Sequence, residues 1–232
     1  MIADVSVVTV FLQFLMIAVF VVVALLIAGN QKRDRRQRSD LLCDLGKSLG
    51  FDQFNPGRDE GFMVGWGFLG ALSRGENRYA CNILRGNYHG QALFAFDFHY
   101  RADAGENKGD NYGTLLMLIE KEVFPQLIIQ SGNLQERIAA ALGIGNEVKF
   151  ESAEFSRVFS VRSQDKRFAY DVCNPQMMDY LMGNRDLQIE INGPVISMAF
   201  EPQLPVEQIE LNLQRLAQIR SLMPDYLFTQ NA

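Results

Sequence analysis

The sequence predicts an α+β protein in which a single N-terminal transmembrane helix precedes a cytoplasmic domain, itself a mainly antiparallel sheet with a C-terminal helix. A long apolar run opens the chain, strands with alternating side chains follow, and a helical repeat of apolar residues comes near the end. We expect a transmembrane anchor at 1–30, a basic juxtamembrane helix and linker at 31–60, and the α+β domain at 61–232. If that domain divides into two subdomains, the break falls near 143–147.

The anchor is predicted from the run between Val5 and Ala28, whose only polar side chains are Ser6, Thr9 and Gln13. As a helix, this run is about 36 Å long, enough to cross a hydrocarbon core of about 30 Å. A cleaved signal peptide is the competing interpretation. Such peptides carry their basic residues before a shorter apolar stretch, whereas here the basic residues follow a longer one. We therefore expect an uncleaved, single-pass anchor.

A basic stripe directly after the run predicts the topology. It consists of Lys32, Arg33, Arg35, Arg36 and Arg38. Basic residues that flank a membrane helix resist translocation. We therefore expect the N-terminus to lie outside and the domain to lie on the cytoplasmic side of the bacterial inner membrane. The stripe can also attract anionic headgroups, at about 1 kcal/mol per residue, so a lipid-headgroup sensor is a further hypothesis.

The net charge and the spacing of the cysteines limit the functional classes to which the protein can belong. The chain has a net charge of −5, and residues 39–232 hold 17 basic and 25 acidic residues. An acidic domain repels phosphate backbones, so we expect no nucleic-acid partner. Cys43, Cys81 and Cys173 form no CxxC pair, and their odd number is typical of a reducing compartment.

The clearest strand is predicted over 91–101, within a series of strands. Its aromatic residues alternate with Ala95, Asp97 and His99, which predicts one buried aromatic face and one solvent face. We expect further strands at 77–86, 113–122, 126–131, 147–152 and 155–163.

Turn and cap signals organise the rest of the domain. Asn192-Gly193 predicts a type I′ turn in a hairpin over 187–200. Asn133 and Gly143 bound a predicted helix at 133–142, and Pro175 opens another that Gly183 ends. A final helix is expected at 206–223.

The order of these segments also resembles a known group of proteins. The matching pieces are the anchor with its basic stripe, Asn82 to Gly86, Phe96 to Tyr100, Glu154 to Val161, Gln164 to Met182, and the end of the chain. In this pattern the chain resembles a widespread uncharacterised bacterial family with N-terminal membrane helices and a cytoplasmic domain. The resemblance implies the anchored α+β architecture and no particular activity.

The sequence motifs that could form a cofactor or metal site are incomplete. Gly65, Gly67 and Gly70 match GxGxxG, but too short an apolar stretch precedes them for a dinucleotide-binding strand. Cys81, His89 and His99 lack the close ligand pair that anchors a zinc site. We therefore predict no catalytic residues, no metal and no cofactor.

Two functions remain besides the lipid-headgroup sensor. The first is a membrane-tethered, non-enzymatic interaction or scaffold protein, an accessory subunit or assembly factor whose partners are the lipid bilayer and a protein at or near the membrane. The alternative is a membrane-bound enzyme with a site assembled from scattered residues, for which Asp97, His99 and Asp171 are the candidates.

Overall fold

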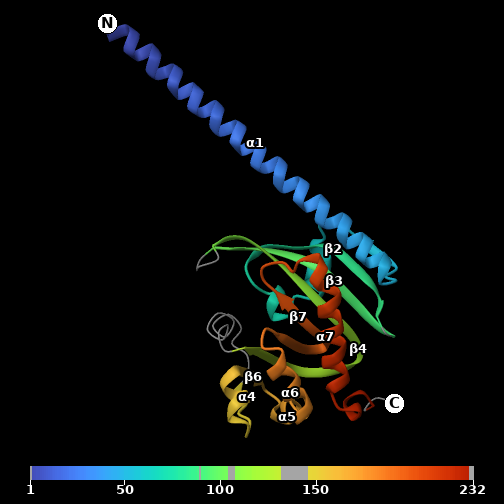
Figure 1. Cartoon of the computed structure of the whole chain (residues 1–232). Helices are drawn as coiled ribbons and strands as arrows, with labels where there is room; N and C mark the ends of the chain where they lie inside the picture. The colour runs from blue at the N-terminus through green and yellow to red at the C-terminus, as the bar shows by residue number, and fades with distance from the viewer. Residues whose placement is uncertain (1, 89, 104–107, 132–145, 230–232) are drawn as a thin grey trace. The chain divides into compact units, whose positions relative to one another are not determined.

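The computed structural model describes residues 2–88, 90–103, 108–131 and 146–229 (Figure 1). The chain forms two compact units, residues 1–42 and residues 43–232. Helix α1 (Ile2–Ser48) makes up the first unit and continues into the second. It therefore continues past the predicted boundary between anchor and linker. Within the described residues, no helix combines the length and the apolarity that a membrane span requires.

The second unit is built on a seven-stranded sheet in which every pair is antiparallel. The strand order is β1-β2-β3-β4-β6-β5, and β7 pairs with β4. The prediction of a mainly antiparallel sheet is thus confirmed. The strands are β1 (Gln53–Asn55), β2 (Glu76–Tyr88), β3 (Gln91–Ala102), β4 (Gly109–Ser131), β5 (Asn146–Glu147), β6 (Phe159–Ser163) and β7 (Ile189–Phe200).

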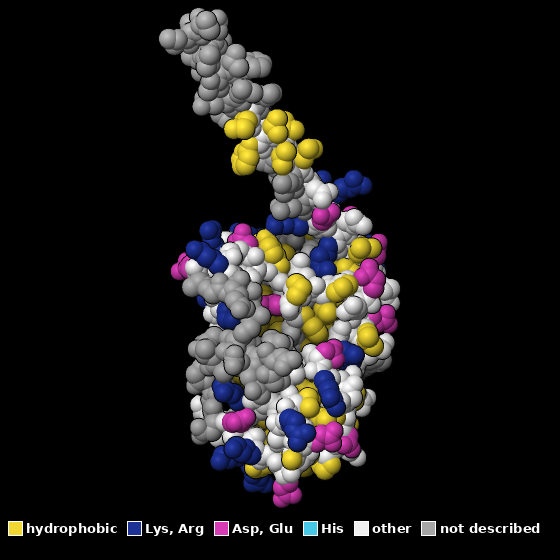
Figure 2. Space-filling model, turned by 60° about the vertical axis from the view of Figure 1, so that its left-hand side comes forward, with side chains coloured by type: hydrophobic (Ala, Val, Ile, Leu, Met, Phe, Trp, Pro, Cys, Tyr) yellow, Lys and Arg dark blue, Asp and Glu magenta, His cyan; other side chains and the backbone are white. Residues whose placement is uncertain are grey.

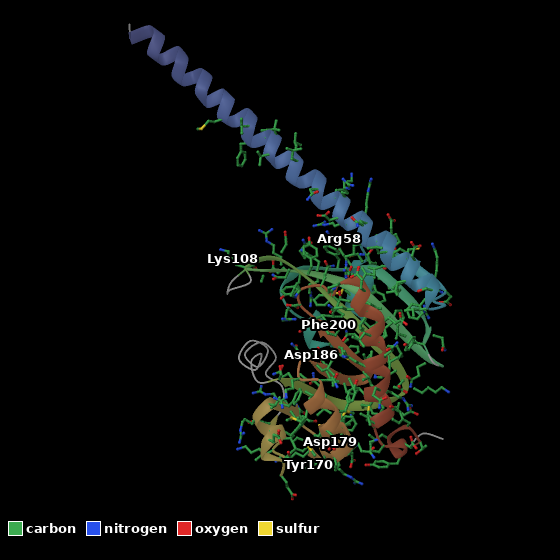
Figure 3. The ribbon with its side chains drawn as sticks, in the orientation of Figure 1. Arg58, Lys108, Tyr170, Asp179, Asp186 and Phe200 are labelled. Atoms are coloured by element: carbon green, nitrogen blue, oxygen red, sulfur yellow. The ribbon has the colours of Figure 1, made fainter. Side chains whose placement is uncertain are left out.

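Short helices surround the sheet, and a longer one follows it. Helix α7 (Ile209–Leu222) confirms the predicted C-terminal helix. The others are α2 (Glu60–Gly65), η1 (Gly70–Leu72), α4 (Ala153–Val158), α5 (Lys166–Val172), α6 (Pro175–Gly183), η3 (Val206–Gln208) and η4 (Asp225–Phe228). Asp59, Asp165 and Asn174 accept hydrogen bonds that cap α2, α5 and α6. Tyr170 and Asp179 mark α5 and α6 beside β6 (Figures 1 and 3).

Strands β4 and β7 run side by side for nearly their whole length, and both change direction in the middle. The register shifts where Phe124 faces Gly193, because β4 has more residues than β7 between the neighbouring pairs. Gly193 takes a positive φ of 58°, a conformation that glycine adopts without steric cost. The irregularity bends the sheet and divides it into a β2–β3 half and a β6–β5 half.

The predicted hairpin over 187–200 is therefore wrong. Residues 189–200 form one continuous strand, and Asn192-Gly193 lies at its irregularity instead of at a chain reversal. The long strand β4 supplies a partner on both sides of this point, so the glycine serves as a bulge position. Pro194, which has no N–H, lies in a strand that pairs only with β4 among the described residues.

Both faces of the central strands are buried. On one face, α2 and η1 cover a core that includes Met63, Leu72, Phe96 and Phe98. On the other face, the backbone N–H of Leu204 donates to Thr114 of β4, and α7 follows this segment in the sequence. The second face of β3, predicted to be solvent-exposed, is therefore covered.

A further local prediction also differs from the structure. The strand predicted over 155–163 begins only at Phe159, because α4 occupies residues 153–158 and is capped by Ser152. The helix predicted at 133–142 lies outside the described residues, as does most of the predicted break near 143–147.

Candidate functional site

A small cavity with a mixed polar and apolar lining lies on the α2–η1 face, where the two halves of the sheet meet. Its volume is about 40 Å³. Residues from η1, β4 and β7 line it, together with Arg74, which follows η1. Its polar side chains are Arg74, Gln130, Gln188, Glu190 and Ser197. The cavity therefore lies where η1 meets β4 and β7.

Glu190 is the acidic side chain that lines this cavity. The Gly70 N–H donates to both of its carboxylate oxygens, at 3.0 Å and 2.8 Å, and the Gln126 amide donates at 3.4 Å. Burial raises the pKa of Glu190, while the hydrogen bonds from Gly70 and Gln126 act in the opposite direction. The Asn192 side chain and the Ala71 N–H also hydrogen-bond to this carboxylate, which therefore fixes η1 to the sheet at the cavity.

Two polar atoms at the same cavity have no hydrogen-bond partner among the described residues. They are Oε1 of Gln130, a residue only 2% exposed, and Nε of Arg74. The Arg74 guanidinium pairs with Glu201 through a different nitrogen and lies over the Tyr100 ring. Because buried polar groups are nearly always paired, an unpaired acceptor and an unpaired donor at one cavity indicate a binding position.

The polar side chains of the cavity suit binding better than bond cleavage. Ser197 donates to the backbone oxygen of Glu190 at 3.0 Å, so its hydroxyl is oriented away from that carboxylate. Among the residues that the structure describes, neither histidine nor cysteine lines the cavity. A carboxylate, an amide oxygen and a hydroxyl oxygen together form a set of hydrogen-bond acceptors.

Asp97, predicted to lie on a solvent face, is instead 1% exposed, so that prediction is wrong. Asn82 and Thr114 donate to its two carboxylate oxygens, each at 2.9 Å. Thr114 also accepts from the Leu204 N–H at 3.1 Å. The cluster links β2, β3 and β4 to the segment that leads into α7.

His99 is also buried, next to Asp97 on the same face of β3. Its ring stacks on Tyr79, with centroids 4.5 Å apart, and lies 4.8 Å from the Tyr112 ring. Its two nitrogens contact the backbone oxygen of Asn77 and the Asp110 carboxylate. Aromatic rings therefore enclose the imidazole.

Asp171 lies apart from these two residues, on α5. It lines an open groove of about 460 Å³ together with Arg167 and Tyr226. A hydrogen bond to Asp171 raises the pKa of Tyr226. The structure therefore brings Asp97 and His99 together inside the sheet and leaves Asp171 in a different groove, so the three do not form one site.

The remaining motifs occupy structural positions. Gly65 ends α2 and Gly70 begins η1, so a helix and not a strand precedes the last glycines of the GxGxxG match. Cys81 faces Asp97 across the β2–β3 pair, and His89 lies outside the described residues. Among the residues that the structure describes, no group of three or more His, Cys, Asp or Glu side chains gathers to hold a metal ion.

Two apolar surfaces are exposed. On α1, the described side chains between Met16 and Leu26 are exposed, with Phe20 at 75% (Figure 2), and the basic stripe follows on the same helix. In the second unit, Val64 is 81% exposed and Phe68 44% exposed, beside the half-buried Trp66. We call Val64, Trp66 and Phe68 the aromatic patch. The stripe itself lies within α1, where all its residues except the half-buried Arg38 are exposed.

The sequence does not reveal the cavity residues. Its local patterns predict a hairpin around Glu190 and Ser197 and a short strand around Gln130. Their only local signal was a carboxylate and an amide on strands of otherwise apolar character.

No protein-family model matches the chain, and no curated protein matches its sequence. Its structure is similar to the crystal structure of the mycobacterial trehalose monomycolate transport factor A, TtfA, with a TM-score of 0.61. The two chains are 19% identical, and the similarity covers 82% of this chain and 97% of that one. At this identity, the likeness shows a shared fold, an α+β domain with an antiparallel sheet and a C-terminal helix.

Proposed function

We propose that this protein is a membrane-tethered, non-enzymatic interaction protein that acts as an accessory subunit or assembly factor of a larger membrane complex. The observation that carries the proposal is the apolar surface of α1, within the run from Val5 to Ala28. Its described side chains are too apolar to remain exposed to water without cost. A lipid bilayer removes that cost for a helix, whose backbone groups pair internally.

The tether is a single-pass anchor in the inner membrane, with the second unit on the cytoplasmic side. The basic stripe at 32–38 supports this orientation, because lysine and arginine resist translocation. A tethered domain meets membrane partners at a raised effective concentration, so contacts of modest affinity are sufficient.

The aromatic patch supports the accessory role. Large apolar side chains that remain exposed on a folded domain commonly mark a contact with another molecule. Aromatic residues are also the side chains that contribute most to interface affinity. The fold neighbour's name, a transport factor, is compatible with an accessory role in membrane transport.

The tether is tested by reporter fusions at the C-terminus. We expect a reporter that is active only in the cytoplasm to be active in the wild type. We expect it to lose activity when the five stripe residues are replaced by Glu, because the topology signal is then removed. Replacement of five exposed acidic residues of the domain by Lys serves as the control. A reporter that is active only outside the cytoplasm in the wild type would refute the orientation.

The accessory role is tested by purification in mild detergent. We expect a defined membrane protein to co-purify with the wild type and to be lost from the double variant Val64→Asp, Phe68→Asp. Leu211→Asp is the matched control, since Leu211 is 50% exposed on a different element, helix α7. Recovery of this chain alone, or unchanged co-purification from the double variant, would contradict the proposal.

A further inference from the structure

Three acceptors line the cavity beneath η1. Gln130 Oε1 has no partner among the described residues, the Ser197 hydroxyl oxygen can still accept, and Glu190 carries a carboxylate that several hydrogen bonds hold in place. These three acceptors come from β4 and from both halves of β7. A group with several N–H donors matches such a set.

The charges at the cavity favour a cation. Within the described part of the chain, no lysine, arginine or histidine forms an ion pair with Glu190. Arg74 lines the same cavity, but its charge is paired with Glu201. Carboxylates largely removed from water are normally paired with a positive charge, so the cavity lacks one positive charge for neutrality.

The unpaired Nε of Arg74 adds a second requirement. This N–H needs an oxygen acceptor, which an ammonium group alone does not provide. A ligand that carries both an ammonium group and a nearby oxygen would pair every orphaned atom of the cavity.

We propose that the cavity binds a primary ammonium group that carries an oxygen acceptor about two carbons away. A volume of 40 Å³ holds about three to four water-sized groups, which matches the nitrogen, two carbons and an oxygen of a 2-aminoethanol unit. The rest of a larger ligand extends through the open side of the cavity. Free amino alcohols and the ethanolamine headgroup of a phospholipid share this chemistry.

Calorimetric titration of the full chain in mild detergent tests the site, with ethanolamine as the probe. Four heavy atoms limit the dissociation constant to roughly 0.05–5 mM. We expect propylammonium, which lacks the oxygen, to bind at least about threefold more weakly. We expect tetramethylammonium, which has no N–H donors, to give no heat beyond that of potassium chloride at equal ionic strength.

Three variants separate binding from folding. Glu190→Gln should weaken ethanolamine binding by about tenfold or more, as expected for a lost charged hydrogen bond. Gln130→Leu should also weaken it, while the free protein keeps or raises its melting temperature, because an unpaired buried acceptor has been removed. Glu120→Gln is the control, a change at a buried carboxylate that pairs with Arg220 elsewhere in the sheet.

The two ligand sources are distinguished in nanodiscs. If the headgroup occupies the cavity, discs that contain phosphatidylethanolamine should weaken the apparent affinity for free ethanolamine, whereas phosphatidylcholine discs should not. Equal affinity in both discs assigns the site to a free amine.

The proposal is overturned if ethanolamine gives no more heat than potassium chloride, if tetramethylammonium binds equally well, or if Gln130→Leu keeps the wild-type affinity. The detergent titration does not need the membrane anchor, so its failure is separate from a failure of the proposed tether.

Discussion

At Gly113 of β4, a single added carbon should disturb the packing of the core. A Cβ at this position would meet the Phe98 ring, 2.6 Å from its Cε1, and would lie 2.7 Å from the backbone oxygen of Phe200. Phe98 is fully buried, and Phe200 belongs to the edge strand β7 (Figure 3). The ring cannot move into solvent, so Gly113→Ala must shift a packed side chain, a strand, or both.

Overpacking of this kind costs about 1–3 kcal/mol of unfolding free energy. For a domain of this size, that corresponds to a fall of about 2–12 °C in the melting temperature. Gly183→Ala is the control, because a Cβ at the end of α6 meets nothing within 4 Å. It should leave the stability unchanged or raise it by about 0.4–1 kcal/mol.

Urea denaturation followed by the fluorescence of Trp66 measures both changes. If the clash with Phe98 is the cause, Phe98→Leu should cost less stability in the Gly113→Ala background than in the wild type, so the double-mutant cycle should show coupling. A Gly113→Ala variant within 0.5 kcal/mol of the wild type would refute the packing argument, as would strict additivity with Phe98→Leu.

Three further results are expected. Asp97→Ala should lower the unfolding free energy by about 2–4 kcal/mol, since it orphans the donors of Asn82 and Thr114, whereas Asp97→Asn should cost less; denaturation curves compare the two. The pKa of Glu190 is raised in the folded state, so its contribution to stability is greatest below its ordinary pKa and is lost as the pH rises through the raised value. The stability of the wild type relative to Glu190→Gln should therefore fall as the pH rises above 4.5, the ordinary pKa of this carboxyl, and a constant difference would contradict this. Burial raises the pKa of the Cys173 thiol to about 12, so iodoacetamide at pH 8 should modify the half-buried Cys43 before Cys173, as mass spectrometry of digests would show.

The regular segments of this fold could be predicted from local patterns. The alternation in β3, the apolar stripe of α7 and the proline that opens α6 each reflect a periodicity or a cap within a few residues. Such signals depend on the neighbouring sequence alone, and they were sufficient for the antiparallel sheet and the final helix.

The errors come from signals whose meaning depends on distant partners. Asn192-Gly193 permits a positive φ, but whether the chain then reverses or only bulges depends on the length of β4, which no local pattern gives. Asp97 and His99 alternate with aromatic residues and so look solvent-exposed, yet the segment around Leu204 covers them. The cavity lies where η1 meets β4 and β7, so the residues Gln130, Glu190 and Ser197 could be assembled only in three dimensions.

The length of β4 has a consequence for protein synthesis. Residues 92–119 can form a local β3–β4 hairpin as soon as they leave the ribosome. The other edge of β4 stays unpaired until residues 189–200 have been synthesised. During that interval, the nascent chain presents a long row of unsatisfied amides and carbonyls to any neighbouring polypeptide. Messages truncated before codon 189 should therefore yield insoluble fragments, and only chains that reach the final strand and helix can close the sheet.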